Sequence, residues 1–171
     1  MSENAPVILV LGGVRSGKSA VAESLIADLS GGGPVTYLAT GRADLADTEF
    51  AQRIADHRSR RPRHWTTVEV DGDLAAAVDG TSGPVLVDSV TTWMSADPTF
   101  EPDVAALVAA LARRREPVVL VSDEVGFGGY PATDIGGRFA DALGRCNQDL
   151  ADGADRVLLV VAGRTLELPP R

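Results

Sequence analysis

Eight residues near the start of the chain have the types and spacing of a phosphate-binding loop. Residues 12–19 read GGVRSGKS and match G-x-x-x-x-G-K-[ST] at every required position, between an apolar run at 7–11 and a helical pattern at 17–29. In such a loop, backbone N–H groups converge on phosphate oxygens, and the helix that follows adds the positive end of its dipole. The predicted nucleotide-binding residues are Gly12, Gly13, Val14, Arg15, Ser16, Gly17, Lys18 and Ser19.

Two side chains of this loop have specific predicted roles. The amine of Lys18 would reach the terminal phosphates as a catalytic cation, and the hydroxyl of Ser19 would ligate Mg²⁺. The alternative is a glycine-rich turn that carries a lysine by chance. The position between a strand and a helix favours nucleotide binding over that alternative.

Magnesium also requires an acidic ligand, and Asp88 is the candidate because it ends the apolar run PVLVD at 84–88. The alternative role for Asp88 is the N-cap of a helix, since DSVTT is also a plausible helix start. Asp123 and Glu124 follow the next apolar run, so they too are expected at the carboxyl edge of the sheet. A flexible loop explains this second acidic pair equally well.

Both histidines of the chain lie in DTEFAQRIADHRSRRPRHW, at 47–65. A helix over 47–60 would place Phe50, Ile54 and His57 on one face, so the pattern alone favours a packed core histidine over a catalytic one. Arg58, Arg60 and Arg61 come next in the chain. They could pair with a triphosphate, or equally form the solvated end of a helix. His64 and Trp65 are predicted to form a turn in which the tryptophan anchors the next strand.

The elements that must position these residues alternate between strands and helices. Unbroken apolar runs at 7–11, 35–39, 84–88, 117–122 and 156–162 indicate strands that are buried on both faces, and helical patterns lie at 17–29, 47–60, 102–115 and 135–152. This order predicts an α/β fold with a mostly parallel central sheet. A further strand is expected at 66–70, and Gly163-Arg164 would turn the chain so that 165–168 returns as an antiparallel edge.

Length and charge limit the function classes. With 171 residues, one domain spanning 1–171 is expected, and a net charge of −8 argues against a nucleic-acid partner. The single cysteine, Cys146, has no partner for an internal disulfide, and no run approaches the roughly 20 apolar residues of a membrane span. We therefore expect a cytoplasmic protein without a membrane span.

Several stretches together resemble the bifunctional adenosylcobinamide kinase and adenosylcobinamide-phosphate guanylyltransferase family of cobalamin biosynthesis. The similarity runs nearly end to end and rests on GGVRSGKS, YLAT at 37–40, RIADHRSRRPRHW at 53–65, LVDSVTTW at 86–93, VSDEVGFGGYP at 121–131 and GRFADALGRCNQDLADGADRVLLVVAG at 137–163. The R-I-x-x-H-[KR], D-E-V-G-x-G and G-R-x-N-Q stretches are much more specific than the phosphate loop, which very many NTPases share.

The resemblance implies a RecA-like P-loop NTPase with a three-layer fold. It also implies that the chain assembles with two further copies of itself as a homotrimer. It implies phosphorylation of adenosylcobinamide by ATP or GTP, followed by transfer of GMP from GTP through a guanylylated histidine, with release of pyrophosphate. It places that histidine at His57, against the structural role that the pattern favours. Beyond the loop and Mg²⁺, the resemblance places the GTP contacts at Ala39, Thr40, Gly41, Arg58, Ser59, Arg60, Arg61, Glu69 and Asp88.

Two other functions fit the phosphate loop. One is a small-molecule kinase that forms no covalent intermediate, in which His57 would be structural. The other is a nucleotide-binding switch without turnover. Product analysis with GTP and adenosylcobinamide separates all three.

Overall fold

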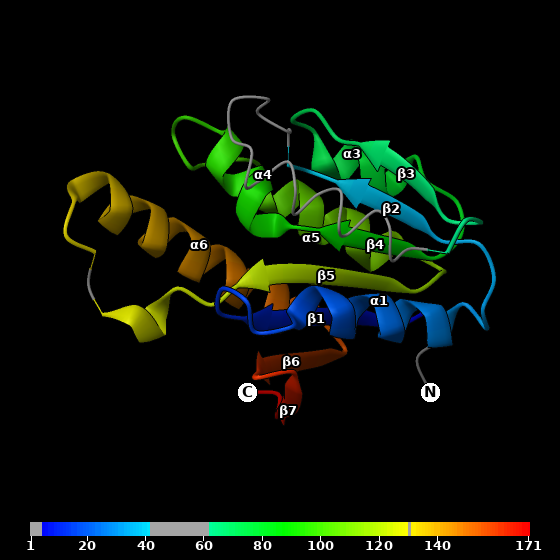
Figure 1. The fold of residues 1–171 in the computed structure, drawn as a ribbon. Coiled ribbons are helices and arrows are strands. Elements are labelled where there is room, and N and C mark those ends of the chain that lie inside the picture. Colours follow the sequence, from blue (N-terminus) through cyan, green and yellow to red (C-terminus); the bar gives the residue numbers. More distant parts are fainter. Residues whose placement is uncertain (1–4, 42–61, 130) are drawn as a thin grey trace.

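A seven-stranded sheet forms the middle layer of the protein, as the computed structural model shows (Figure 1). The structure describes residues 5–41, 62–129 and 131–171. The strand order is β3-β2-β4-β5-β1-β6-β7, and every neighbouring pair is parallel except the last, β6 with β7. The strands are β1 (Val7–Gly12), β2 (Thr36–Ala39), β3 (Thr66–Glu69), β4 (Val85–Asp88), β5 (Val118–Asp123), β6 (Arg156–Val161) and β7 (Arg164–Leu168).

Helices cover both faces of this sheet (Figure 1). Side chains alternate along β1: Leu9 and Leu11 enter one buried cluster, and Ile8 and Val10 enter the other. The helices are α1 (Lys18–Leu29) on the Ile8 side, α3 (Leu74–Asp79), α4 (Val90–Ala96), α5 (Val104–Arg113) and α6 (Asp134–Gly153) on the Leu9 side, and a short 3₁₀ turn, η1 (Gly126–Gly128). The predicted three-layer α/β fold with a mostly parallel sheet is confirmed.

Most predicted elements are present, with ends shifted by one or two residues. The antiparallel edge is confirmed, although the turn residues are Ala162 and Gly163, both at positive φ, and β7 already begins at Arg164. The short helix α3 was not predicted, and α4 was considered only as the alternative in which DSVTT starts a helix. The helix expected at 47–60 lies outside the described residues. No helix among the described residues is long and apolar enough to cross a membrane.

Cys146 lies in α6 and is buried, so its thiol contacts the core instead of solvent. Burial, with a smaller contribution from the charge of Asp149, raises the pKa of the thiol to about 12. Because the thiolate is the reactive form, iodoacetamide should not alkylate the native protein at neutral pH but should alkylate it in urea. Mass spectrometry of the two samples checks this, and rapid labelling of the native chain would contradict the buried position.

Candidate functional site

The loop between β1 and α1 adopts a shape that requires glycine at two positions. Gly17 has φ 94°, a backbone conformation that side chains disfavour, and it directly precedes the first helical residue, Lys18. At Gly12, an added Cβ would lie 2.5 Å from Oγ of Ser16 and 2.8 Å from the carbonyl oxygen of Val160. Gly12 and Gly17 are therefore needed for the tight path of the loop.

The loop rests on the turn between β6 and β7. The N–H of Gly163 in that turn donates to the carbonyl of Ser16 at 2.7 Å, and the N–H of Ser16 donates to the carbonyl of Gly13 at 3.2 Å. An added Cβ at Gly17 would lie 3.2 Å from Cα of Gly163, so the two segments are closely packed. The C-terminal hairpin thus supports the loop from outside.

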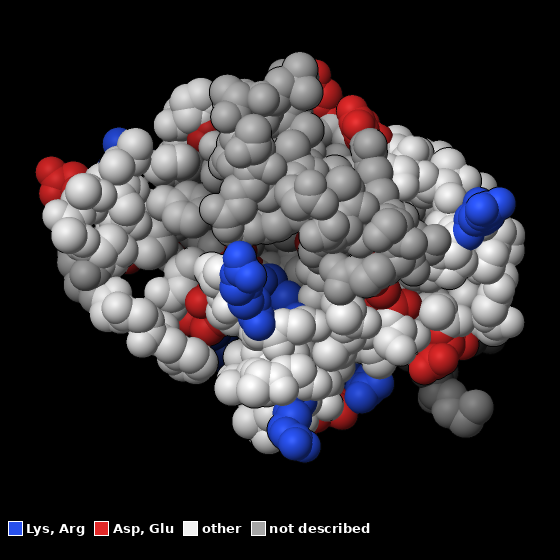
Figure 2. Space-filling view, viewed as in Figure 1, with Lys and Arg blue, Asp and Glu red and all other residues white. Residues whose placement is uncertain are grey.

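Lys18 forms a close ion pair at the site. Its Nζ lies 2.6 Å from Oδ1 of Asp123, and it also donates to the carbonyl of Gly13 at 3.2 Å. The two charged side chains are only 13% and 24% exposed, so water screens this pair less than a surface pair. Figure 2 shows basic side chains with acidic ones beside them where the β1–α1 loop lies in Figure 1.

Hydrogen bonds to both backbone polar groups of Asp123 hold this residue in place. Its N–H donates to Oγ1 of Thr91 at 2.7 Å, and its carbonyl accepts from Nδ2 of Asn147 at 3.0 Å. Asn147 is buried and accepts in turn from the buried hydroxyl of Ser122 at 2.7 Å. Asp123 is the last residue of β5, opposite Gly12, so a flexible loop does not describe it.

Asp88 ends β4 and is not a helix cap. Its Oδ2 accepts a hydrogen bond from the hydroxyl of Tyr37 at 2.7 Å. The N-cap of α4 is Ser89, whose Oγ accepts from the N–H of Thr92. The alternative interpretation of Asp88 as an N-cap is therefore wrong by one residue.

The ends of three neighbouring strands bring further predicted residues together. Ala39 pairs in register with Glu69 on β3 and with Asp88 on β4. Thr40 is buried, and its hydroxyl donates to the carbonyl of Ser89 at 2.6 Å, so it joins the end of β2 to the start of α4. Gly41 follows directly. A nucleotide bound at the loop has to extend past β5 and β4 to touch Ala39 or Glu69, because β1 lies three strands from β2.

The predicted residues His57, Arg58, Ser59, Arg60 and Arg61 lie outside the described residues. The neighbouring turn is described: the N–H of Trp65 donates to the carbonyl of Pro62 at 3.0 Å, and Trp65 packs against the α1-side core. His64 is exposed in that turn. The predicted role of Trp65 as an anchor is confirmed.

Among residues 5–41, 62–129 and 131–171, no three histidine, cysteine, aspartate or glutamate side chains gather closely enough to hold a metal ion. A metal at this site would need ligands from bound phosphates and water, which is how Mg²⁺ is commonly held. Ser19 and Asp88 remain the predicted protein ligands.

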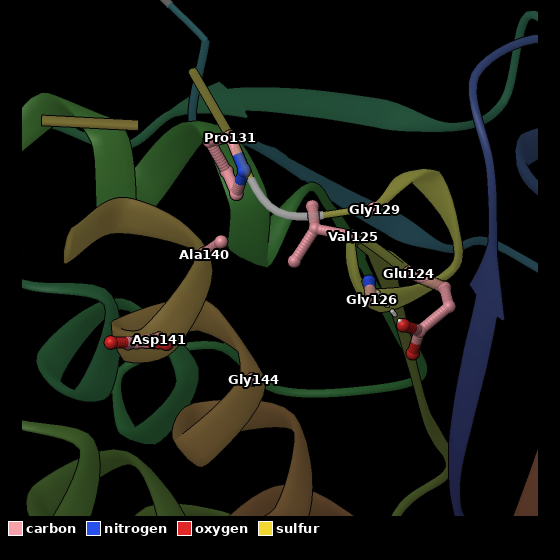
Figure 3. A pocket seen from close by; sticks show the side chains of 8 residues that line it. All are labelled: Glu124, Val125, Gly126, Gly129, Pro131, Ala140, Asp141 and Gly144. Atoms are coloured by element: carbon pink, nitrogen blue, oxygen red, sulfur yellow. Dashed lines mark hydrogen bonds between the residues drawn. The ribbon is translucent and has the colours of Figure 1, made fainter. Parts of the chain in front are cut away.

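A cleft of about 290 Å³ lies between the η1 turn and α6 (Figure 3). Glu124, the residue after Asp123, begins its lining, and its Oε1 accepts from the N–H of Gly126 at 2.6 Å. The N–H of Glu124 also donates to the carbonyl of Gly12 at 3.1 Å, which connects the wall of the cleft to the phosphate loop. On α6, an added Cβ at Gly144 would meet no atom within 4 Å, so the cleft is open there.

Comparison with known proteins gives one family. Residues 8–168 match the family model described as cobinamide kinase / cobinamide phosphate guanyltransferase. The bifunctional adenosylcobalamin biosynthesis protein CobP of Pseudomonas aeruginosa is 38% identical over 94% of this chain and 95% of its own length. The bifunctional adenosylcobalamin biosynthesis protein CobU of Escherichia coli is also 38% identical, over 92% of this chain and 96% of its own length.

Solved structures with lower identity share the fold. The flagellar accessory protein FlaH from Methanocaldococcus jannaschii superposes with a TM-score of 0.58 at 14% identity, covering 97% of this chain and 79% of its own. The KaiC-like protein PH0186 from Pyrococcus horikoshii superposes with a TM-score of 0.52 at 14% identity, covering 90% and 70%. These similarities support the P-loop NTPase fold predicted from the sequence.

Proposed function

Because the chain belongs to the cobinamide kinase / cobinamide phosphate guanyltransferase family, we propose that it makes adenosylcobinamide-GDP in two steps at one phosphate loop. It is a transferase of cobalamin biosynthesis. In the first step a nucleoside triphosphate, ATP or GTP, phosphorylates adenosylcobinamide. In the second, GMP passes from GTP to adenosylcobinamide phosphate.

One observation carries this proposal: a family match over residues 8–168 that includes a phosphate loop with the required geometry. The loop places the N-terminus of α1 and the amine of Lys18 at the end of β1, where a triphosphate binds in this type of fold. Fixed donors of this kind stabilise charge that develops on phosphate oxygens during transfer.

In the kinase step the hydroxyl oxygen of the acceptor attacks the γ-phosphorus. The bond between the γ-phosphorus and the bridging oxygen breaks, and the nucleoside diphosphate leaves. Lys18 and the backbone N–H groups of the loop would stabilise the charge on the leaving group. This step needs no covalent enzyme intermediate.

In the guanylyl step a nitrogen of His57 attacks the α-phosphorus of GTP, and pyrophosphate leaves. The phosphate of adenosylcobinamide phosphate then attacks the same phosphorus and frees the histidine. An unperturbed imidazole has a pKa of about 6.5, so it is largely neutral and nucleophilic at neutral pH. The family resemblance of RIADHR at 53–58 supports His57 in this role.

The remaining predicted residues would bind the nucleotide beyond its phosphates. Ala39, Gly41 and Glu69 lie at adjacent strand ends on the side of the sheet away from β6, which suits the nucleoside part of a molecule whose phosphates sit at β1. The arginines at 58, 60 and 61 would pair with its phosphates. Thr40 would contribute indirectly, by joining the end of β2 to the start of α4, since its hydroxyl already donates to the carbonyl of Ser89.

The donors present fit magnesium. The hydroxyl of Ser19 and the carboxylate of Asp88 are oxygen ligands, the type Mg²⁺ prefers, and phosphates and water would complete its shell. Bound Mg²⁺ neutralises charge on the phosphate oxygens. Tyr37 would orient the Asp88 carboxylate through its hydrogen bond.

Replacing Asp88 tests this ligand assignment. We expect Asp88→Asn to raise the Mg²⁺ concentration required for half-maximal rate by about 10-fold or more, because one anionic ligand is lost. Kinase rates measured across a Mg²⁺ series check this. Asp79→Asn, which removes an exposed carboxylate paired with Arg113, should leave the Mg²⁺ dependence unchanged. An Asp88→Asn variant that melts early and does not respond to Mg²⁺ would instead show a structural role.

Product analysis tests the overall function. The protein is incubated with GTP and adenosylcobinamide. The corrinoid products are then separated by chromatography, and their masses are measured by mass spectrometry. We expect the GDP-linked corrinoid. A reaction that stops at the phosphate indicates a kinase without guanylyl transfer, and absence of both products indicates a nucleotide-binding switch.

We also propose that the protein assembles as a homotrimer, as the family resemblance implies. Light scattering coupled to size-exclusion chromatography should give about three times the chain mass of 17.8 kDa. A monomeric mass would refute the trimer.

A further inference from the structure

We propose that Asp123 is a further catalytic residue: it takes the proton from the acceptor hydroxyl in the kinase step, after Lys18 has moved from Asp123 to the bound triphosphate. This inference rests on the proposed function, because it assigns a role within the kinase reaction. It concerns only that reaction and not guanylyl transfer.

The position of Asp123 places a carboxylate beside the phosphate loop. Strand β5 is the direct neighbour of β1, and Asp123 pairs in register with Gly12, the first residue of the loop. Its Oδ1 lies 2.6 Å from Nζ of Lys18, the amine that would contact the terminal phosphates. A carboxylate that touches this amine is therefore within one side-chain length of the reacting phosphate.

The backbone that carries this carboxylate is also held in place. Hydrogen bonds to Thr91 and from Asn147 fix both the N–H and the carbonyl of Asp123, and Asn147 is itself bonded to Ser122 in the core. A catalytic base needs such support, because small displacements lower the rate steeply.

Binding of a triphosphate changes the partner of Lys18. A triphosphate carries several negative charges, so the amine gains more by contacting phosphate oxygens than by staying with one carboxylate. Asp123 then loses its cation while it remains next to the phosphates. The carboxylate has a free oxygen at the moment when the acceptor arrives, which is the state in which it accepts a proton.

The proton balance of the step is complete with Asp123 as the acceptor. The acceptor O–H bond breaks, its proton goes to the carboxylate, and its oxygen forms the new bond to the γ-phosphorus. The bond from that phosphorus to the bridging oxygen breaks, and Asp123 later releases the proton to water. In guanylyl transfer the attacking groups are a neutral imidazole and then a phosphate that is already ionised at neutral pH, so neither attack requires a carboxylate base.

A cleft that starts one residue after Asp123 would hold the acceptor. It begins at Glu124 and runs between the η1 turn and α6, with glycine or alanine at Gly126, Ala140 and Gly144 (Figure 3). Its charged lining residues are Glu124 and Asp141, both carboxylates, which suit a ligand that donates hydrogen bonds. An acceptor that carries hydroxyl and amide N–H groups and no negative charge fits this lining better than an anion.

Asp123→Asn tests the proposal through two effects of opposite direction. The kinase kcat should fall about 10²- to 10³-fold because the base is lost. Binding of a non-hydrolysable GTP analogue, measured by calorimetry, should become about two- to fivefold tighter, because Lys18 no longer leaves an ion pair. Labelling of the protein from GTP carrying ³²P at the α-position should remain at the wild-type level. A purely structural role would not tighten nucleotide binding.

Glu167→Gln is the matched control, since it removes an exposed carboxylate that pairs with Arg156 on the β6–β7 edge. It should change none of the three measurements. A normal kinase kcat in Asp123→Asn, unchanged or weaker analogue binding, or equal loss of kinase and labelling would each overturn the proposal. Failure of the wild-type protein to phosphorylate adenosylcobinamide would instead refute the proposed function, so the two failures are distinguishable.

Discussion

Lys18→Ala should lower both the kinase rate and guanylyl transfer by about 10²- to 10³-fold, because both steps would use the same triphosphate cradle. The amine lies at the end of the phosphate loop and donates to the carbonyl of Gly13, so its removal takes away the cation that would contact the terminal phosphates. The two rates are measured separately, by formation of adenosylcobinamide phosphate and by formation of the GDP-linked corrinoid from added phosphate.

Arg113→Ala is the control for loss of a basic side chain. Arg113 is exposed on α5 and pairs with Asp79 on α3, so its loss should leave both rates unchanged. If Lys18→Ala retains a near-normal rate for either step, the two reactions do not share one phosphate site, and the single-loop proposal must be abandoned.

The features that the sequence predicted well are local ones. The phosphate loop and β1 follow from residues that are adjacent in the chain, and the structure places them as expected. The buried strands were recognisable because both of their faces are apolar, as the two clusters around Leu9 and Val10 show. Helix α3 was missed, and α4 was considered only through its start at DSVTT, because six or seven residues span too few turns for a helical period to emerge.

The charged centre of the site was harder to predict because it depends on which strands are neighbours. The pattern identified Asp123 as the end of an apolar run but did not show that β5 lies directly beside β1. That pairing brings Asp123 to Lys18 across 105 positions of the chain. The polar support from Asn147 also comes from α6, far along the chain, so no short motif reveals it.

The start of helix α4 was recognisable in the sequence, but the cap was assigned to Asp88 instead of Ser89. Ser89 and Thr92 form a reciprocal pair of side-chain and backbone hydrogen bonds at the start of α4. The serine therefore caps the helix, and the neighbouring Asp88 is left to face the carboxyl edge of the sheet with Tyr37. Because Ser89 and not Asp88 is the cap, Asp88 is a candidate metal ligand instead of a structural helix cap.

His57→Asn should abolish the covalent adduct and guanylyl transfer while part of the kinase activity persists. Incubated with GTP labelled at the α-phosphate, the wild-type protein should retain label in a bond that acid cleaves and base spares, as expected for a phosphoramidate. Label at the γ-phosphate should not be retained. The kinase step needs only direct attack of the acceptor hydroxyl on the γ-phosphorus, so it does not depend on the imidazole.

His64→Ala is the matched control, because His64 is the second of the two histidines of the chain and is exposed in the turn before β3. This variant should keep the adduct and both activities, since the loss of an exposed side chain leaves the turn between Pro62 and Trp65 intact. Label on His64 instead of His57, mapped by mass spectrometry, would show that the nucleophile is wrongly assigned. If neither histidine carries label while the GDP-linked corrinoid still forms, GMP passes directly from GTP to the acceptor phosphate, and the covalent route is wrong.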